Sequence, residues 1–169
     1  MDFYIIAQAI GLIAFATGCW AFFDQNGDQF RVKLIYFQIL MCIHFFFLDA
    51  DVSAFITIIA ALRTYISTKT NSLWIMSFFI MLIWVSGLYY LTNVSEILAM
   101  LGSSIGTYAL FRHQGIQLRC IMLFNSLMWF INNLLLHSIG GSLVEGMFLI
   151  ISLATIYQMK RKQGALLIH

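Results

Sequence analysis

The chain has 169 residues, of which 62% are hydrophobic and 9% are charged, with a formal net charge of +2 and a mean hydropathy of +0.90. Soluble domains carry about 25% charged residues, so this composition excludes an extended soluble domain. In lipid every backbone polar group must be satisfied within the protein, which leaves helices or a closed barrel. The apolar runs are long and lack the alternation of barrel strands, so the sequence predicts an all-α membrane protein.

Seven apolar segments follow one another along the chain, and each is predicted to be a transmembrane helix. The first has no basic stretch before it and no small-residue cleavage site, so we expect it to be retained. The division between the second and third segments, at residues 49–51, is the weakest boundary because both segments are short. The segments cover residues 3–23, 34–48, 52–67, 73–91, 94–111, 120–136 and 143–157.

The chain contains an internal repeat. The segment AFFDQNGDQFR at 21–31 recurs as ALFRHQGIQLR at 109–119, an offset of 88 residues (109 − 21 = 88), with five identities in eleven positions. Such a match, in register and without a gap, indicates a tandem duplication. The seven segments therefore group as three, one and three, and the single linker gives both triplets the same orientation.

We therefore predict two parallel three-helix bundles joined by a linker transmembrane helix and related by an axis along the membrane normal. The first bundle covers residues 1–68, the linker helix residues 69–92 and the second bundle residues 93–159. Residues 160–169 are predicted to form a cytoplasmic tail. In proteins built from such repeats, a substrate pathway usually lies at the interface between them.

With seven alternating crossings, the loops on one side of the membrane collect the basic residues. The opposite side receives Asp2, Asp49 and Asp51 and no Lys or Arg. Loops rich in Lys and Arg stay cytoplasmic, so the amino terminus is predicted outside and the carboxyl terminus inside. The residues on the basic side are Arg31, Lys33, Lys69, Arg112, Arg119, Lys160, Arg161 and Lys162.

Polar side chains within the apolar segments identify a candidate site. His44 is expected near the middle of the membrane, and the repeat pairs it with Asn132, beside Asn133. Polar groups at this depth are unfavourable against lipid, so all three are expected to point into the bundle. Two interpretations are open: the groups form a substrate pocket on the pseudo-two-fold axis, or they are hydrogen bonds that hold helices together.

Three further residues are candidates for substrate contact. Arg63 lies inside the third segment, where it either extends to the inner headgroups or is buried with a carboxylate or a substrate. Glu145 is expected near the outer end of the seventh segment, where it could pair with His137 or bind a proton. Trp129, one helical turn before Asn132, could stack on a ring-shaped ligand, although packing against helices or lipid is the commoner role.

The repeated turn element joins the first and second helices of each triplet. Gly27 and Gly115 are expected to end the preceding helices in the left-handed conformation. Arg31 and Arg119 are expected to anchor at lipid phosphates. The alternative is that this element acts as a hinge or an inner gate.

No residue pattern supports an enzyme. The sequence has no nucleophile–base pair, zinc-binding helix motif, phosphate-binding glycine loop or dinucleotide fingerprint. Cys19, Cys42 and Cys120 lie in or at the start of apolar runs and form neither a disulfide framework nor a metal signature. We therefore expect no catalytic residues, no metal site and no cofactor, and the unclustered basic residues do not predict binding of nucleic acid.

Several short runs carry a resemblance to a known family, among them HFF at 44–46, ALRT at 61–64 and, most specifically, SIGGSLVEG at 138–146. Over nearly its whole length the chain resembles the YgjV family of bacterial inner-membrane proteins. The resemblance implies the inner membrane, with a periplasmic amino terminus. That family is similar in layout to the SWEET sugar transporters and the PQ-loop group. Those proteins use proline hinges, whereas this chain has no proline, so movement must bend at glycines such as Gly11 and Gly106 or shift whole bundles.

We therefore predict a small-molecule transporter with a central pocket near His44, Asn132, Asn133 and Trp129. The acidic outer side favours a neutral or cationic solute. The alternatives are a membrane receptor or sensor with a PQ-loop-like layout, and a non-transporting scaffold in which the buried polar groups only hold helices together. Membrane lipid and an unidentified solute are the expected partners, and the sequence leaves a homo-oligomer open.

Overall fold

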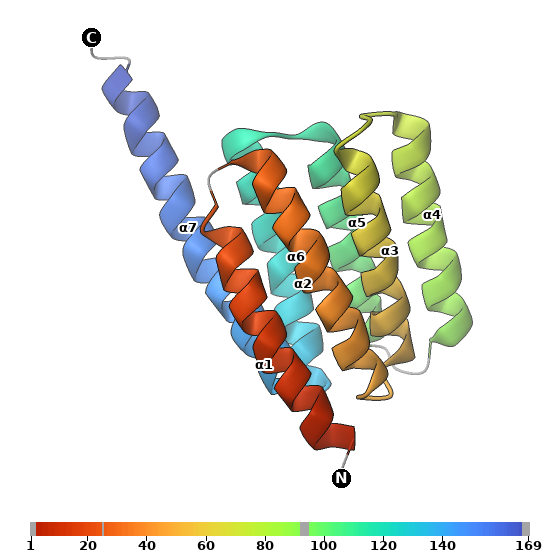
Figure 1. The fold of residues 1–169 in the computed structure, drawn as a ribbon. Helices are drawn as coiled ribbons and strands as arrows, with labels where there is room; N and C mark the ends of the chain where they lie inside the picture. The colour runs from red at the N-terminus through yellow and green to blue at the C-terminus, as the bar shows by residue number, and fades with distance from the viewer. Residues whose placement is uncertain (1–2, 25, 92–94, 167–169) are drawn as a thin grey trace.

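The computed structural model describes residues 3–24, 26–91 and 95–166, and in these residues the chain forms seven α-helices (Figure 1). An all-helical fold follows from the apolar composition, because each helix satisfies its own backbone hydrogen bonds. The first helix begins at one end of the bundle, and the last helix ends at the opposite end. The helices are α1 (Phe3–Phe22), α2 (Gly27–Phe46), α3 (Asp51–Ser67), α4 (Leu73–Tyr90), α5 (Glu96–Arg112), α6 (Gly115–Leu135) and α7 (Ile139–Leu166).

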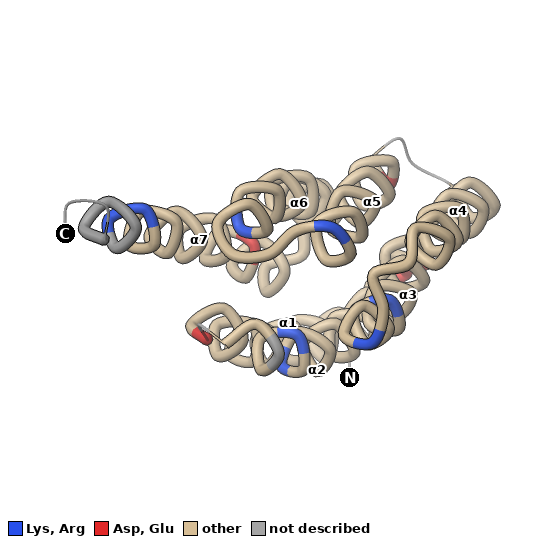
Figure 2. Tube along the Cα trace, turned by 90° about the horizontal axis from the view of Figure 1, so that it is seen from above, with Lys and Arg blue, Asp and Glu red and all other residues tan. Residues whose placement is uncertain are grey.

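The helices are arranged in two layers of three. α1, α2 and α3 lie side by side in one layer, and α5, α6 and α7 form the other (Figure 2). The layers contact each other along two edges, through α1 on α7 and through α3 on α5. α4 packs against α3 and α5 and covers the second edge. The middle helices, α2 and α6, face each other across the interior between the two edges.

The internal repeat of the sequence reappears in the helix bounds and in the turns. α2 begins at Gly27 and α6 at Gly115, which is again an offset of 88 (115 − 27 = 88). Asp49 and His137, at the same offset, both have a left-handed backbone, with φ of 54° and 52°. They lie in the α2–α3 and α6–α7 turns, so the two layers turn back on themselves in the same way.

Helix ends differ from the apolar segments because apolarity marks contact with lipid rather than the limit of a helix. α2 begins at Gly27 and α6 at Gly115, ahead of the apolar runs predicted from 34 and 120. α7 continues to Leu166, into the segment predicted to be a tail. The left-handed conformation expected at both turn glycines occurs at Gly115, with φ of 57°, but not at Gly27.

Apart from Arg63 and Glu145, which are buried in the interior, the charged residues lie near the two ends of the bundle. The α1–α2, α3–α4 and α5–α6 connections lie at one end, close to Arg31, Arg112 and Arg119. We call this the basic end. The opposite end, which we call the acidic end, carries Asp49 and Asp51 in the α2–α3 turn.

Four of the described helices are long and apolar enough to cross a membrane by length and composition. They are α1, α4, α6 and the Ile139–Arg161 part of α7. α3 and α5 are shorter, at 17 residues each. Large apolar side chains cover the outside of the bundle, for example Trp74 and Tyr89 on α4, which are 87% and 82% exposed. An apolar exterior of this kind suits contact with lipid.

α1 and α7 approach closely where two glycines meet. A Cβ added at Gly140 would lie 2.5 Å from the carbonyl carbon and 2.7 Å from the Cα of Gly11. Gly11 also leaves room for the ring of His44, whose Cε1 would lie 2.9 Å from a Cβ at that position. Small residues let helix backbones come into contact inside a membrane. The edge between α1 and α7 therefore depends on these glycines.

We expect Gly140→Ala to destabilise the protein by about 1–3 kcal/mol, because the added methyl group meets backbone atoms of α1 that cannot move by themselves. Gly146→Ala is the matched control on the same helix, since its Cβ would lie 3.5 Å from the nearest Phe130 atom, an ordinary contact. Gly140 lies in the first turn of α7 and Gly146 in its interior, and alanine favours the helix over glycine at both positions. Thermal unfolding of the two purified variants in detergent measures the difference, and equal stabilities would contradict the close approach of α1 and α7.

Candidate functional site

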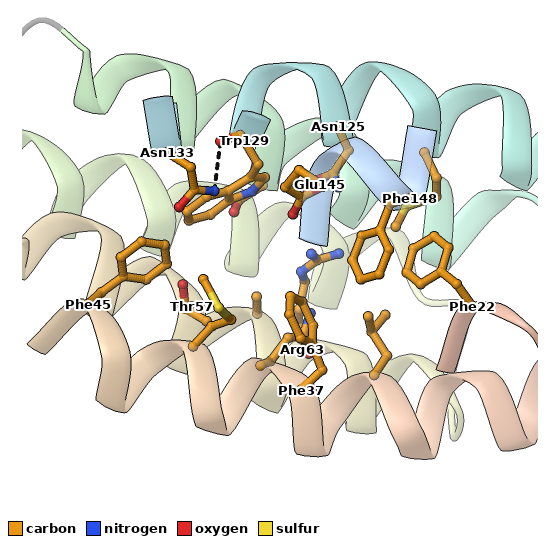
Figure 3. A pocket seen from close by; sticks show the side chains of 16 residues that line it. Phe22, Phe37, Phe45, Thr57, Arg63, Asn125, Trp129, Asn133, Glu145 and Phe148 are labelled. Carbon is orange, nitrogen blue, oxygen red and sulfur yellow. Dashed lines mark hydrogen bonds between the residues drawn. The ribbon is translucent and has the colours of Figure 1, made fainter. Parts of the chain in front are cut away.

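A cavity of about 50 Å³ lies between the two layers, with α2 on one side and α6 on the other (Figure 3). Every helix except α4 contributes side chains to its lining. Since a buried water needs about 10–15 Å³ of such space, the cavity of about 50 Å³ has room for about three to five water molecules. The cavity is therefore a shared feature of the two repeats, and in this conformation it is too small for a large ligand.

Arg63 projects from α3 into this cavity. Its side chain is buried, and Nε and Nη1 have no hydrogen-bond partner among the described residues. Gly106 on α5 makes room for the guanidinium group, because a Cβ there would lie 3.1 Å from Nη2. Helical side chains lean toward the N-terminus of their helix, so Arg63 extends away from the basic end and into the interior. Of the two alternatives for Arg63, extension to the headgroups is therefore wrong.

Glu145 reaches the same cavity from α7, in the opposite layer (Figure 3). Its side chain is buried beside Ser126, and its Oε2 has no hydrogen-bond partner among the described residues. His137 is exposed, and no ion pair joins it to Glu145. The pairing with His137 that the sequence suggested does not form, and Glu145 instead points toward the side of the cavity that holds Arg63.

The two charged groups face each other without forming a close ion pair. Among the described residues, the one ion pair within 4.0 Å joins Lys33 and Asp24, outside this cavity. Burying a charge in a low-dielectric interior is expensive unless the charge is paired and hydrogen-bonded. Charged residues within membrane helices therefore usually mark substrate or ion pathways. Arg63 and Glu145 are the strongest such signal in this structure.

Amide side chains complete the polar lining. The Nδ2 of Asn133 donates to the carbonyl of Trp129 at 2.9 Å, which leaves Oδ1 without a partner among the described residues. The Oε1 of Gln38 on α2 is also buried without one. With its amide oriented to satisfy both atoms, Asn125 donates to the carbonyl of Gly102 at 2.8 Å. The lining thus combines unpartnered acceptors with the unpartnered donors of Arg63.

His44 lies outside this cavity. It is in the last turn of α2, near the acidic end, so the expectation that it lies at mid-membrane depth is wrong. Its Nδ1 is 2.6 Å from the carbonyl oxygen of Ala7, and its Nε2 is 2.7 Å from Oγ of Ser138. A further hydrogen bond runs from the backbone N–H of Gly141, which donates to Oγ of Ser138 at 3.1 Å. His44 therefore connects α1, α2 and the start of α7.

Asn132 also forms a contact between helices. Its Nδ2 donates to Oγ of Ser53 on α3 at 3.2 Å, across the interface between the layers. Of the six residues predicted to contact a substrate, four line the cavity: Arg63, Trp129, Asn133 and Glu145. His44 and Asn132 do not. Their geometry matches the alternative in which polar groups hold helices together.

Aromatic side chains bound the cavity toward both ends of the bundle. Trp129 stacks on Phe45, with ring centroids 5.7 Å apart and an interplanar angle of 26°. Phe22 stacks on Phe148 nearer the basic end, with centroids 3.5 Å apart. Figure 3 shows these pairs on either side of Arg63 and Glu145. One face of Trp129 is thus already covered by Phe45.

A second cavity, of about 650 Å³, lies at the basic end. Both copies of the repeated turn line it, together with Phe30, Arg31 and Arg119. The edge of Phe30 packs against Phe22, with centroids 5.2 Å apart, and the guanidinium of Arg119 lies 4.9 Å from the centroid of Phe30. Because Phe22 also lines the central cavity, these rings separate the two cavities.

The arginines of the repeated turn connect the layers at the basic end. Arg31, on α2, donates to the carbonyl of Leu110 on α5 and to that of Ser67, each at 3.4 Å. Arg119, on α6, donates to the carbonyl of Asp24 at 3.2 Å. Each arginine therefore reaches into the other layer. Both arginines therefore bond to protein carbonyls instead of extending freely to lipid phosphates.

Asp24, whose carbonyl accepts the hydrogen bond from Arg119, also forms an ion pair through its side chain. The carboxylate of Asp24 accepts from Nζ of Lys33 at 2.5 Å and from the backbone N–H of Asn26 at 2.9 Å. The hydrogen bond from Lys33, followed by that from Asn26, lowers the pKa of Asp24 below its usual value. Asp24 therefore stays ionised at neutral pH and keeps its ion pair with Lys33.

Sequence reasoning missed Gln38, Thr57 and the phenylalanines of the cavity. Gln38 carried the clearest signal, because a glutamine inside an apolar segment is as unfavourable against lipid as a histidine. Phenylalanine is frequent throughout this chain, with 16 occurrences, so no single one could be assigned to a cavity. Thr57 bonds its own helix at the carbonyl of Ser53, a pattern that sequence alone does not distinguish.

Comparison with known proteins agrees with the composition and the fold. The chain matches the family described as Imp-YgjV, bacterial inner membrane protein, over residues 5–163. It is 36% identical to the inner membrane protein YgjV of Escherichia coli (strain K12) over 163 residues, which cover 96% of this chain and 89% of that protein. No solved structure matches the chain. The chain therefore belongs to the YgjV family and is a multi-pass protein of the bacterial inner membrane.

Proposed function

We propose that this protein is a small-solute transporter and that the cavity between α2 and α6 is its binding site. The observation that carries the proposal is the pair of buried charged groups, Arg63 and Glu145, which face one cavity from opposite layers with unpartnered atoms. An interior built only for stability would pair such groups or replace them by apolar side chains. No reaction at a catalytic residue is part of this proposal.

The position of the cavity supports the same function. It lies between two repeated three-helix layers, where transporters built from repeats bind their substrates. It is bounded toward the acidic end by Phe45 and Trp129, and toward the basic end by Phe22 and Phe148. This arrangement corresponds to an occluded state. The solute would leave toward the acidic end or the basic end, depending on which end of the two layers separates.

The proposal includes the orientation in the membrane. All seven helices would cross it as two parallel bundles joined by α4, with the basic end in the cytoplasm because Lys and Arg are retained there. α3 and α5 are shorter than the roughly 20 residues of an isolated span. Both are packed between neighbouring helices, so they need less apolar surface of their own. The amino terminus would then be periplasmic.

Two sets of contacts are proposed as gates. At the basic end, Arg31 and Arg119 connect the layers. At the acidic end, His44 connects α1 and α2 to Ser138 at the start of α7. Both sets consist of a few hydrogen bonds, which can break and reform as whole layers move. Such a movement needs no proline hinge.

Solute flux tests the proposal directly. Purified protein in liposomes is expected to take up at least one class of labelled solute, among sugars, amino acids, amines and nucleosides, faster than protein-free liposomes. The measurement is initial uptake at several external concentrations, and saturation is expected because the site is a single cavity. Ligand-dependent thermal stabilisation without flux would instead favour a receptor. The absence of both flux and stabilisation for every class would contradict transport.

Loss of the basic-end contacts should open the cavity toward that end. We expect the double change Arg31→Gln and Arg119→Gln to increase the labelling rate of a cysteine at position 103 about tenfold, because bonds from charged donors contribute about 1.5–3 kcal/mol. Ser103 is fully buried and lines the cavity. Labelling uses a thiol reagent on vesicles with the basic end accessible, after Cys19, Cys42 and Cys120 are replaced by alanine.

The matched control for this gate is Arg112→Gln, an exposed arginine at the same end of the bundle. Within the part of the chain that the structure describes, no hydrogen bond or ion pair joins Arg112 to the other layer, so the labelling rate should not change. A double variant that labels no faster than this control would argue that Arg31 and Arg119 do not restrict access to the cavity.

The orientation gives a separate prediction. Green fluorescent protein fused after His169 should be fluorescent in a bacterial host, and alkaline phosphatase fused at the same position should be inactive. The reason is that seven crossings with a cytoplasmic basic end leave the carboxyl terminus inside. Active phosphatase together with a dark fluorescent fusion would show the opposite orientation, or an even number of crossings.

A further inference from the structure

We propose that the solute is a small zwitterion of the amino acid type, with its carboxylate bound at Arg63 and its ammonium group at Glu145. This inference rests on the transport function proposed above and names the substrate class for the same site. It goes beyond the preference for a neutral or cationic solute that the sequence suggested, because the structure brings a cation and an anion to one cavity.

The donor side of the cavity fits a carboxylate. Arg63 presents Nε and Nη1, both buried and both without a partner among the described residues. A guanidinium is planar and always charged, and its N–H groups match the two oxygens of a carboxylate. No carboxylate of the described residues lies within 4.0 Å of Arg63. A carboxylate supplied by the solute would therefore satisfy both donors.

The acceptor side of the cavity fits an ammonium group. Glu145 lines the cavity from the opposite layer, with Oε2 unpartnered. Gln38 contributes a further unpartnered acceptor, Oε1, from α2. An ammonium group has three N–H donors and no acceptor. It would pair with the carboxylate of Glu145 and donate to a neutral oxygen as well.

Charge balance separates a zwitterion from other solutes. The lining carries one arginine and one glutamate, so a zwitterion offers a carboxylate to the first and an ammonium donor to the second, whereas a simple anion or cation serves only one of them and brings an excess charge into a low-dielectric interior. A sugar offers hydroxyl groups but no charge for either Arg63 or Glu145. The site therefore favours a solute that is neutral overall and carries both charges.

The size of the cavity favours the smallest members of this class. About 50 Å³ admits a few water molecules and no long side chain. Stacked phenylalanines bound it, with Phe22 against Phe148 at the side nearer the basic end. Glycine and alanine are therefore the probes to use, and amino acids with large side chains should bind less well.

Competition against labelled glycine tests the inference on the wild-type protein in liposomes. Unlabelled glycine and alanine should compete, whereas acetate and methylamine, which each keep one of the two charges, should compete about 10- to 100-fold less well, as expected for the loss of one charge-assisted hydrogen-bonding group. Glucose should not compete. Uptake of a sugar, an anion or a cation in preference to glycine would overturn the proposal that the solute is a zwitterion. It would not contradict the proposed transport function.

Neutralising one charge at a time should change specificity in opposite directions. Glu145→Gln leaves a cationic cavity, so binding should shift from glycine toward acetate. Arg63→Gln leaves an anionic cavity, so binding should shift toward methylamine. A merely structural role would lower binding of all probes alike. The measurement is competition binding of glycine, acetate and methylamine to each variant.

The controls are Arg112→Gln and Asp51→Asn, which remove the same charges from exposed positions and should leave the order of the probes unchanged. If a cavity variant is not monodisperse in detergent, the wild-type competition series decides alone. Equal competition by glycine, acetate and methylamine would overturn the inference. No binding and no flux for any solute class would instead overturn the transport function itself.

Discussion

The two layers touch along their edges and stay apart at their middle helices, and this constraint generates the cavity. At one edge Gly11 and Gly140 let α1 and α7 meet backbone to backbone. At the other, Gly106 leaves space on α5 for the guanidinium of Arg63. α2 and α6 carry larger side chains toward the interior, such as Phe45 and Trp129, whose stacked rings keep the two helices apart. The distribution of glycine and aromatic residues thus shapes a site that neither layer contains alone.

The buried polar groups divide into two kinds, those that join helices and those that line the cavity. His44 and Asn132 bond to neighbouring helices, at 2.6–2.7 Å and 3.2 Å, and neither lines the cavity, although Oδ1 of Asn132 has no partner among the described residues. Arg63 and Glu145 keep unpartnered atoms in a cavity. An uncompensated charge is unfavourable there, which is the ground for proposing that a ligand completes these two groups.

Few hydrogen bonds join the two layers at the basic end, and this favours a movement that needs no proline hinge. Arg31 and Arg119 occupy equivalent positions in the two repeats, and each bonds a carbonyl in the opposite layer. Because both are hydrogen bonds at helix ends, breaking them leaves each layer internally intact. In the proposed transport cycle the layers would move as whole units, and the stacked pair of Phe22 and Phe148, which lies between the two cavities, would have to separate.

Composition and the internal repeat were sufficient to predict helices, their number and their order, because these properties depend on residues close together in the sequence. They also indicated four residues that line the cavity: Arg63, Trp129, Asn133 and Glu145. The depth of a polar side chain along the bundle and the direction in which it points were not predictable in the same way. His44 shows this for depth, and Arg63 shows it for direction. A polar residue inside a helix shows that it must avoid lipid, but not which neighbour it meets. That choice depends on the rotation of each helix and on which edges of the two layers come together, and only the tertiary structure decides both.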